Sequence, residues 1–269
     1  SSMYLEQLVL EIENSVLSRL ESTKPFVVGF SGAQGSGKST ICSNLQNNLV
    51  KRGLVTLTLG LDDFYLENSE RLALGKEVHP LCSVRGVPGT HDVKYLKATL
   101  SALIKADGGS KICWPSFSKA SDDRHGQNQF YYHEGHVDVI LLEGWCVGAR
   151  SSFVQSLAEN EWEFEHDPRC RWKEWTKNAA IQYESIWQEI DFAVMLFQSS
   201  FERVIDARWR QEMDLLKRSG ESQFQSRSDV VEFCQHYRSW TRGMCVHFPS
   251  LADLVFDCLD GYSYVTRKT

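Results

Sequence analysis

The feature that most constrains the fold is a glycine-rich stretch at residues 27–40, which reads V-V-G-F-S-G-A-Q-G-S-G-K-S-T. It contains the spacing G-x-x-x-x-G-K-[ST], typical of a phosphate-binding loop between a strand and a helix. An apolar run at 26–30 predicts the strand, and residues 39–50 predict the helix. Glycines let such a loop fold tightly, so that its N–H groups line an anion-sized hollow at a helix N-terminus. We therefore expect a P-loop.

Each residue of this loop is a candidate to bind the phosphates of a nucleotide. Lys38 supplies a positive charge for the β- and γ-phosphates, and the Ser39 hydroxyl is placed to ligate Mg²⁺. The alternative, a glycine-rich surface turn that binds nothing, is disfavoured by the strand and helix on either side. The predicted nucleotide-binding residues are Gly32, Ala33, Gln34, Gly35, Ser36, Gly37, Lys38, Ser39 and Thr40.

The hydrophobic pattern predicts an α/β fold in which strands and helices alternate. We expect a P-loop NTPase three-layer sandwich, with a mainly parallel five-stranded central sheet and helices on both faces. The predicted strands are 26–30, 54–61, 137–145, 191–197 and 254–258, and the predicted helices are 3–21, 39–50, 93–106, 201–218 and 228–247.

The whole chain, residues 1–269, is expected to form one domain with insertions. The insertions at about 66–92 and 111–135 should lie on the substrate side, and about 199–220 should form a lid. The first insertion reads as a long polar connection, and such loops in compact domains are usually functional. In the second, residues 111–117 and 129–133 should pair as a small accessory hairpin.

Composition excludes several classes of partner. A net charge of −6 argues against a protein that coats nucleic acid or an anionic membrane, because such binding needs clustered Lys and Arg. No stretch reaches the roughly 18 consecutive apolar residues of a membrane span, and the N-terminus lacks a basic region followed by an apolar core. The eight cysteines are scattered singly, which predicts reduced thiols and no zinc site. We expect a cytoplasmic monomer or homodimer that binds neither nucleic acid nor membrane.

Two strands are predicted to end in acids at the sheet edge that carries the P-loop. The strand at 54–61 runs into Asp62 and Asp63, followed by Tyr65, and a turn-capping role is the alternative for this pair. Because neighbours on an extended segment point to opposite sides, at most one of the two should face the phosphates. The strand at 137–145 ends in Glu143, a Walker B pattern in which the carboxylate holds Mg²⁺. The following glycine would allow close approach of substrate or phosphate.

Basic residues and a histidine in the loops are candidates to hold the second substrate. They are Arg85, His91, Lys119 and Arg124, although a solvated turn is an equal reading of the segment at 85–92. Asp63 and Tyr65, after the strand at 54–61, are further candidate substrate contacts. Arg203 and Arg210 are seven residues apart, so they should share a helix face where many P-loop kinases carry a closing lid. A solvated basic helix is the alternative.

Together these parts favour phosphoryl transfer to a small hydroxyl. There is no N-K-x-D motif to read guanine, and the Walker B strand ends in Glu-Gly where a switch GTPase would have D-x-x-G. A kinase needs in addition an acceptor-side base and cationic groups around the transferred phosphoryl group. The alternative from another class is an ATP-binding regulatory protein without kinase activity.

Several motifs resemble those of the D-glycerate 3-kinase family, which is related to uridine kinase, pantothenate kinase and phosphoribulokinase. The motifs are L-D-D-F-Y-L at 61–66, R-G-V-P-G-T-H-D at 85–92, L-L-E-G-W at 141–145 and W-R-Q-E at 209–212. One departure is the substrate loop, where Phe117 stands in place of the tyrosine of the family pattern P-x-Y-[DN]-K-S-A, while Lys119 and Asp123-Arg124 are kept.

The resemblance implies a role for each candidate. ATP and Mg²⁺ would be the cofactors, Asp62 rather than Asp63 would be the general base, and Arg210, alone or with Arg208, would close over the phosphoryl group. The loop cations and His91 would bind an anionic group of the acceptor. The implied acceptor is D-glycerate or a similar hydroxy acid, and a nucleoside or pantothenate-like acceptor stays open.

Overall fold

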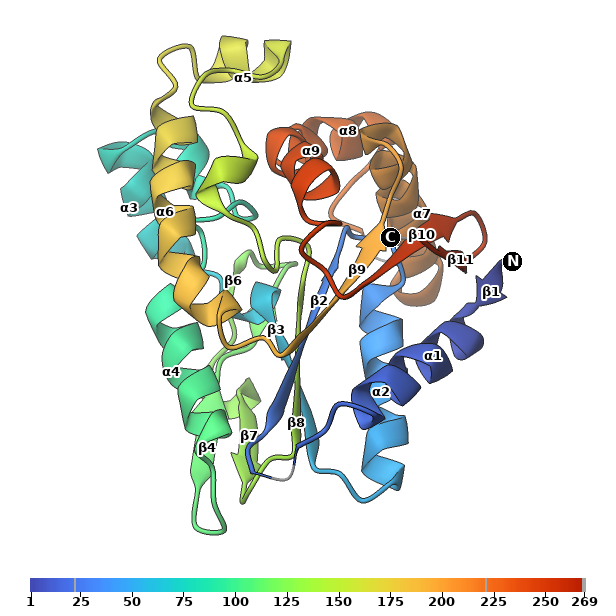
Figure 1. Cartoon of the computed structure of the whole chain (residues 1–269). Helices are drawn as coiled ribbons and strands as arrows, with labels where there is room; N and C mark the ends of the chain where they lie inside the picture. Colours follow the sequence, from blue (N-terminus) through green and yellow to red (C-terminus); the bar gives the residue numbers. More distant parts are fainter. Residues whose placement is uncertain (22, 221, 268–269) are drawn as a thin grey trace.

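Seven strands form the central sheet of the protein, whose computed structural model describes residues 1–21, 23–220 and 222–267 (Figure 1). Their order is β1-β11-β10-β9-β2-β8-β3. The five parallel strands are β2 (Phe26–Gly32), β3 (Thr56–Gly60), β8 (Val139–Gly144), β9 (Phe192–Phe197) and β10 (Leu254–Leu259). This parallel sheet confirms the predicted architecture.

Two antiparallel edge strands lie beyond the predicted five. They are β11 (Ser263–Thr266), which pairs with β10, and β1 (Met3–Tyr4), which pairs with β11. The sequence pattern placed β1 inside the first helix, because two residues are too few to show a period of two. These strands bring the two ends of the described chain together at one side of the sheet.

Helices cover both faces of the sheet and create two separate cores. On one face, α1 (Leu5–Leu17) and α2 (Lys38–Lys51) pack on inward-facing strand residues such as Val28 and Phe30. On the other face, α4 (Val93–Ile104) and α6 (Arg171–Trp187) pack with Val27 and its neighbours. Because successive strand residues point to opposite faces, both cores draw on the same strands, and the result is the three-layer sandwich seen in Figure 1.

The remaining elements are two small strand pairs and further helices outside the central sheet. The hairpin of β4 (Lys111–Trp114) and β7 (Tyr131–Glu134) confirms the predicted pairing. A second small pair forms between β5 (Phe117–Ser118) and β6 (Asp123–Arg124). The other helices are α3 (Asn68–Glu77), α5 (Glu161–His166), α7 (Phe201–Ser219), α8 (Arg227–Gln235) and α9 (Arg238–His247).

Two predictions about helices were wrong. The segment at 66–92 contains α3, which was missed because it has no apolar stripe and fully buries only Arg71. The helix expected at 228–247 is instead α8 and α9, separated by His236 and Tyr237. The break lets α8 pack on α7 through Val230 while α9 packs into the core of the main sheet through Trp240.

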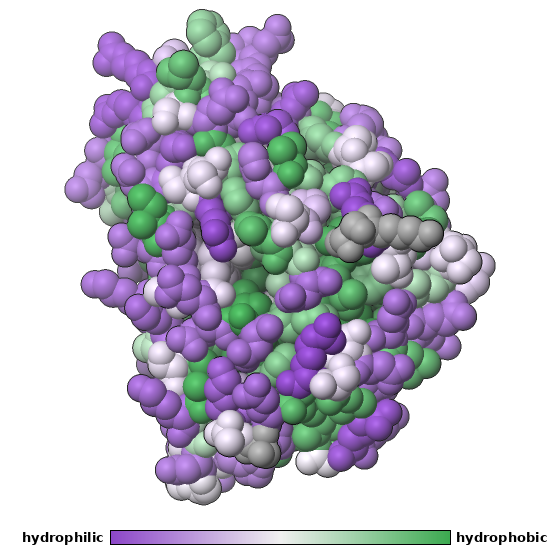
Figure 2. Space-filling view, in the orientation of Figure 1, coloured by the Kyte–Doolittle hydropathy of each residue, from purple (hydrophilic) through white to green (hydrophobic). Residues whose placement is uncertain are grey.

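The next features are the hydropathy of the surface, the length of the helices and the state of the cysteines. Hydrophilic residues cover the rim of the face shown in Figure 2, and hydrophobic ones gather near its middle. None of the helices in the described ranges is long and apolar enough to cross a membrane. All eight cysteines are free, and most are buried.

Candidate active site

The P-loop leads from β2, near the centre of the sheet, into helix α2. Gly35 and Gly37 have φ values of 83° and 88°, a left-handed conformation that favours glycine. The N-terminus of α2 has no side-chain cap, so its N–H groups are free to bind an anion. The Ser36 hydroxyl is buried without a hydrogen-bond partner. These features fit the phosphates of a nucleotide.

Two elements that are distant in sequence hold the P-loop in place. Ala207 of α7 packs so closely on Gly35 that a Cβ there would lie 2.7 Å from the Ala207 Cβ. On the other side, the Tyr264 hydroxyl donates a hydrogen bond of 2.7 Å to the carbonyl oxygen of Ser36. Sequence reasoning missed Tyr264, because nothing local shows that the last strand reaches the loop.

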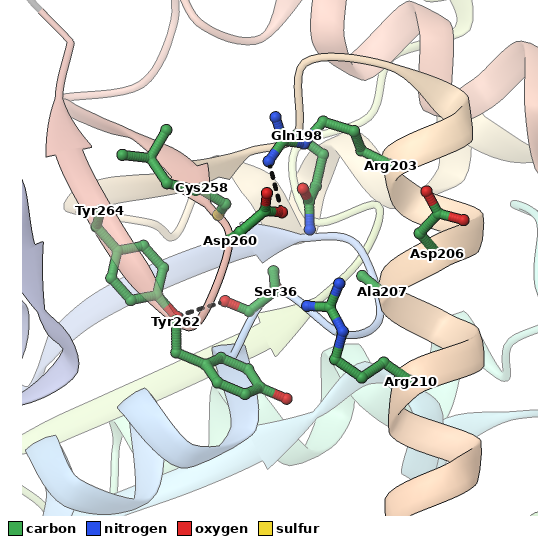
Figure 3. A pocket seen from close by; sticks show the side chains of 12 residues that line it. Ser36, Gln198, Arg203, Asp206, Ala207, Arg210, Cys258, Asp260, Tyr262 and Tyr264 are labelled. Atoms are coloured by element: carbon green, nitrogen blue, oxygen red, sulfur yellow. Dashed lines mark hydrogen bonds and ion pairs between the residues drawn. The ribbon is translucent and has the colours of Figure 1, made fainter.

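A pocket opens between the P-loop, α7 and the turn from β10 to β11 (Figure 3). Arg203 and Arg210 both line it, which confirms that they share a helix face. Arg203 Nη2 lies 2.9 Å from the Asp260 carboxylate. Arg208 points elsewhere and is almost fully buried, with Nη2 3.0 Å from Glu212 Oε1. Of the two candidate lid arginines, Arg210 is therefore the one that faces this pocket.

The Walker B carboxylate lies beside the P-loop lysine. Lys38 Nζ donates to the Gly32 carbonyl oxygen at 2.9 Å and lies 3.4 Å from Glu143 Oε2. Lys38 begins α2, which follows β2, and Glu143 lies on β8, which pairs with β2 in parallel. Gly144 has a packing role in place of the predicted approach of a ligand, because a Cβ there would lie 2.7 Å from the Leu61 Cβ.

The two adjacent aspartates sit on a 3₁₀ helix, Leu61–Phe64, and the predicted extended segment was wrong. The tight turn lets both carboxylates approach the sheet edge from different sides. Asp62 Oδ2 is 2.7 Å from Lys119 Nζ. Asp63 Oδ1 accepts a hydrogen bond of 3.2 Å from the Phe117 amide. A Cβ on Gly60 would lie 3.1 Å from both Asp63 Oδ2 and Glu143 Oε1.

The same surroundings move the pKa values of the two aspartates in opposite directions. Burial by itself would raise the pKa of Asp62, but the charges of Lys119 and Lys38 hold it well below its usual value. Burial raises the pKa of Asp63 to about 7, and the charges of Asp62 and Glu143 add to this effect. Asp62 is therefore the carboxylate that is ionised at neutral pH.

His91 is close to the aspartates but is not a cation. Burial lowers its pKa to about 4 even though the nearby Asp62 charge acts in the opposite direction. Its Nδ1 atom is 2.7 Å from the Tyr183 hydroxyl, and the ring stacks on Tyr65 with centroids 4.4 Å apart. Tyr65, a predicted substrate contact, is buried and supports the imidazole. At neutral pH, His91 can therefore form a hydrogen bond with a ligand but not an ion pair with an anionic one.

The structure places the three candidate cations, Arg85 and the Lys119 and Arg124 of the loop at 118–128 (the acceptor loop), in different surroundings. Lys119 reaches Asp62, as described above. Arg124 is largely buried at 3.2 Å from Glu67 Oε1 and 3.6 Å from Asp92 Oδ2, and its Nε and Nη2 have no hydrogen-bond partner. Arg85 is held by Asp122 and Gln223 through its two terminal nitrogens. Arg85 thus connects the acceptor loop to the segment that follows α7.

Sequence reasoning missed Arg71, a fully buried cation that anchors the acceptor loop. Its guanidinium donates to the carbonyl oxygens of Leu66, Ser83 and Asp122 and to the Asp122 side chain. Asp122 has a φ value of 53°, which these hydrogen bonds hold in the left-handed region. A lone arginine in a polar segment gave no signal of this role.

Oxygen ligands suited to Mg²⁺ lie beside the P-loop. Ser39 is exposed in the first turn of α2, and the Glu143 carboxylate is nearby on β8. Within the described part of the chain, no group of three or more His, Cys, Asp or Glu could hold a metal by itself. Mg²⁺ usually takes one or two protein oxygens together with phosphates and water. The residues present therefore fit Mg²⁺ that is bound together with a nucleotide.

Comparison with known proteins identifies the family. An uncharacterised kinase of Schizosaccharomyces pombe, mug58, is 30% identical over 229 residues, which are 80% of this chain and 79% of that relative. The chain belongs to the P-loop small-molecule kinases. The chloroplastic D-glycerate 3-kinase of Arabidopsis thaliana is 28% identical to this kinase over 238 residues, which are 85% of this chain but 49% of the plant protein. No protein-family model matches the chain.

The fold of the kinase is also that of solved relatives. A D-glycerate 3-kinase structure from Cryptococcus neoformans superposes with a TM-score of 0.70 at 23% identity, covering 94% of each chain. Together with the P-loop and the sequence relatives, this makes the protein an ATP-dependent kinase related to D-glycerate 3-kinase.

The raised pKa of Asp63 predicts a pH effect on stability. A carboxyl whose pKa is higher in the folded state stabilises the fold below its usual pKa, and this contribution is lost as the pH rises to about 7. Without nucleotide and Mg²⁺, the free energy of unfolding of the wild type relative to Asp63→Asn should fall by up to about 1.4 kcal/mol per pH unit between about pH 4 and 7.

Urea denaturation at pH 5, 6 and 7 would measure this difference. Glu165→Gln, on an exposed position of α5, is the control and should follow the wild type at each pH. A difference between wild type and Asp63→Asn that does not change with pH would show that Asp63 titrates normally.

Proposed function

We propose that this kinase transfers the γ-phosphoryl group of ATP to a hydroxyl of D-glycerate or a similar small hydroxy acid. The observation that carries the proposal is the contact of Lys119 with Asp62, 2.7 Å between Nζ and Oδ2. It places a partly exposed cation, suited to an acceptor carboxylate, directly beside the carboxylate that would accept the hydroxyl proton. Two relatives named D-glycerate 3-kinase support the same acceptor.

The phosphate side of the proposed reaction is served by the P-loop. Its N–H groups and Lys38 hold the β- and γ-phosphates, and Arg210 closes over them from α7. Ser39 and Glu143 would hold Mg²⁺, which would offset negative charge on these phosphates. Such preformed positive groups stabilise the charge of the transition state more than that of the ground state.

On the acceptor side, Asp62 would act as the general base. The acceptor hydroxyl donates to Asp62 Oδ1, which is buried and has no partner in the protein. As the hydroxyl oxygen attacks, the bond between Pγ and the bridging β-oxygen breaks, ADP leaves, and the proton passes to Asp62. The low pKa of Asp62 keeps it ionised and ready for this step at neutral pH.

The acceptor remains to be identified by assay, because a nucleoside or pantothenate-like acceptor would use the same phosphate side. ADP release should be followed with Mg·ATP and one of D-glycerate, uridine or pantothenate, and without any acceptor. We expect release that depends on D-glycerate. Release that depends on uridine or pantothenate would replace the proposed acceptor, and equal release in all samples would indicate an ATPase.

Lys38→Ala provides the catalytic control for this assay. Removing the lysine charge should lower kcat by at least about 100-fold, because preformed charges of this kind stabilise the transition state by several kcal/mol. The fold should persist, because Lys38 does not hold the helices together. Circular dichroism, which reports helix content, checks this. Turnover near the wild-type rate in the folded variant would show that the P-loop lysine is not part of the reaction.

Lys119 tests the acceptor side separately. Lys119→Ala should raise the KM for D-glycerate by about 10- to 100-fold, the usual range for a charged hydrogen bond. The affinity for ATP measured without acceptor should stay the same, because Lys119 is proposed to contact the acceptor and not the nucleotide. Isothermal titration with ATP measures the affinity for ATP, and steady-state kinetics with D-glycerate measure the KM.

The matched control is Lys111→Ala, whose exposed lysine lies on β4 and is 3.9 Å from Glu134. This variant should leave the KM for D-glycerate and the affinity for ATP unchanged. Arg124→Ala should raise the same KM, with an added loss of stability because its contacts with Glu67 and Asp92 disappear. A parallel loss of ATP affinity in Lys119→Ala would assign that residue to the nucleotide.

A further inference from the structure

Among the buried polar atoms without a partner in the described protein, two lie on the acceptor side on segments that pair with each other. They are Asp62 Oδ1, on the 3₁₀ helix after β3, and His91 Nε2, just before α4. The segments that carry the two side chains lie side by side, because the Asp92 amide donates to the Phe64 carbonyl oxygen at 2.6 Å, and each side chain shifts the pKa of the other. Leaving a buried polar atom unpaired costs about 1–3 kcal/mol, and native proteins seldom do so. A neighbouring pair of such atoms therefore points to a ligand.

The hydrogen bonds of Tyr183 determine which nitrogen of His91 carries the proton. The Gly89 amide donates to the Tyr183 oxygen at 2.8 Å. The same hydroxyl lies 2.7 Å from His91 Nδ1, and its one proton has no other acceptor among the hydrogen bonds of the described residues. Tyr183 therefore donates to Nδ1, which leaves the proton of the neutral imidazole on Nε2.

His91 is held rigidly in this orientation. The ring is 4% exposed and stacks on Tyr65 at an interplanar angle of 17°. The backbones of Tyr65 and His91 also form an antiparallel bridge. Because its pKa is far below neutrality, the imidazole presents a fixed, uncharged N–H donor beside the carboxylate of Asp62.

A donor next to the base cannot serve the reacting hydroxyl itself. The oxygen of that hydroxyl donates its proton to Asp62 and uses a lone pair to attack phosphorus. A second hydrogen bond to the same oxygen would draw on that lone pair and make it a weaker nucleophile. The donor is therefore better matched to a different oxygen, one that lies close to the reacting hydroxyl in the acceptor.

We propose that His91 Nε2–H recognises a second acceptor oxygen on the carbon next to the one that carries the reacting hydroxyl. This inference rests on the proposed function and narrows its substrate to acceptors with oxygens on adjacent carbons. In D-glycerate the second oxygen is the 2-hydroxyl. His91 contacts the substrate and sets specificity, and Tyr183 is a positioning residue that fixes the His91 tautomer.

An acceptor that lacks the second oxygen provides the test. 3-Hydroxypropanoate has the same carboxylate and the same primary hydroxyl as D-glycerate but no 2-hydroxyl. The wild type should prefer D-glycerate by at least about 100-fold in kcat/KM, because a site built to hydrogen-bond a hydroxyl rejects the analogue without it. In His91→Leu this preference should fall below about 5-fold, mainly through loss of activity with D-glycerate.

The control is His133→Leu on the β4–β7 hairpin, which should keep the wild-type preference. An unchanged preference in His91→Leu, or a wild type that does not distinguish the two acids, overturns the inference while the proposed function stands. If the wild type phosphorylates neither acid, the proposed function and the inference both fail.

Tyr183→Phe tests the positioning role without removing His91. It should raise the KM for D-glycerate by about 10-fold, as expected for one weakened neutral hydrogen bond, with the affinity for ATP unchanged. In ¹⁵N NMR of histidine-labelled protein at pH 7, His91 of the wild type should be neutral with the proton on Nε2. In Tyr183→Phe both neutral tautomers should be present. A proton on Nδ1 in the wild type would overturn the inference even if His91→Leu did not fold.

Discussion

The ion pair between Lys38 and Glu143 joins the start of α2 to the end of β8 at the edge of the sheet that carries the P-loop. Lys38 begins α2 after β2, and Glu143 ends β8, which pairs directly with β2. The position of both residues follows from the strand order. Because β3 is the strand next to β8, the two aspartates that follow it also reach this edge. The ends of neighbouring strands therefore bring the site residues together.

Opposite charges are paired on both the phosphate side and the acceptor side of the site. Lys38 faces Glu143, Lys119 faces Asp62, and Arg124 lies between Glu67 and Asp92. Such pairs keep buried charges from being left uncompensated. ATP and an acidic acceptor would bring new negative charge to Lys38 and Lys119, so each substrate competes with a carboxylate already present. In the proposed reaction, this exchange frees Asp62 to interact with the acceptor hydroxyl.

Local patterns predicted the sheet, the P-loop and the Walker B acid, because each depends on a short run of residues. Contacts between distant residues were beyond such reasoning: Tyr264 reaches Ser36, Tyr183 orients His91, and Arg71 anchors Asp122. The extended geometry assumed for Asp62 and Asp63 was wrong, since a two-residue pattern cannot distinguish a strand end from a 3₁₀ turn. Helix α3 was missed because the residue that it buries is Arg71 and it has no apolar stripe.

The roles of the two adjacent aspartates are the central claim, and kcat of Asp62→Asn and Asp63→Asn at saturating ATP and D-glycerate tests it most directly. Asn keeps the size of the side chain but cannot accept the proton. Asp62→Asn should lower kcat by about 10²- to 10⁴-fold, the usual contribution of a general base, with ATP still bound. Asp63→Asn should lower kcat far less. The opposite order, measured on folded proteins, would contradict the account and assign the base to Asp63.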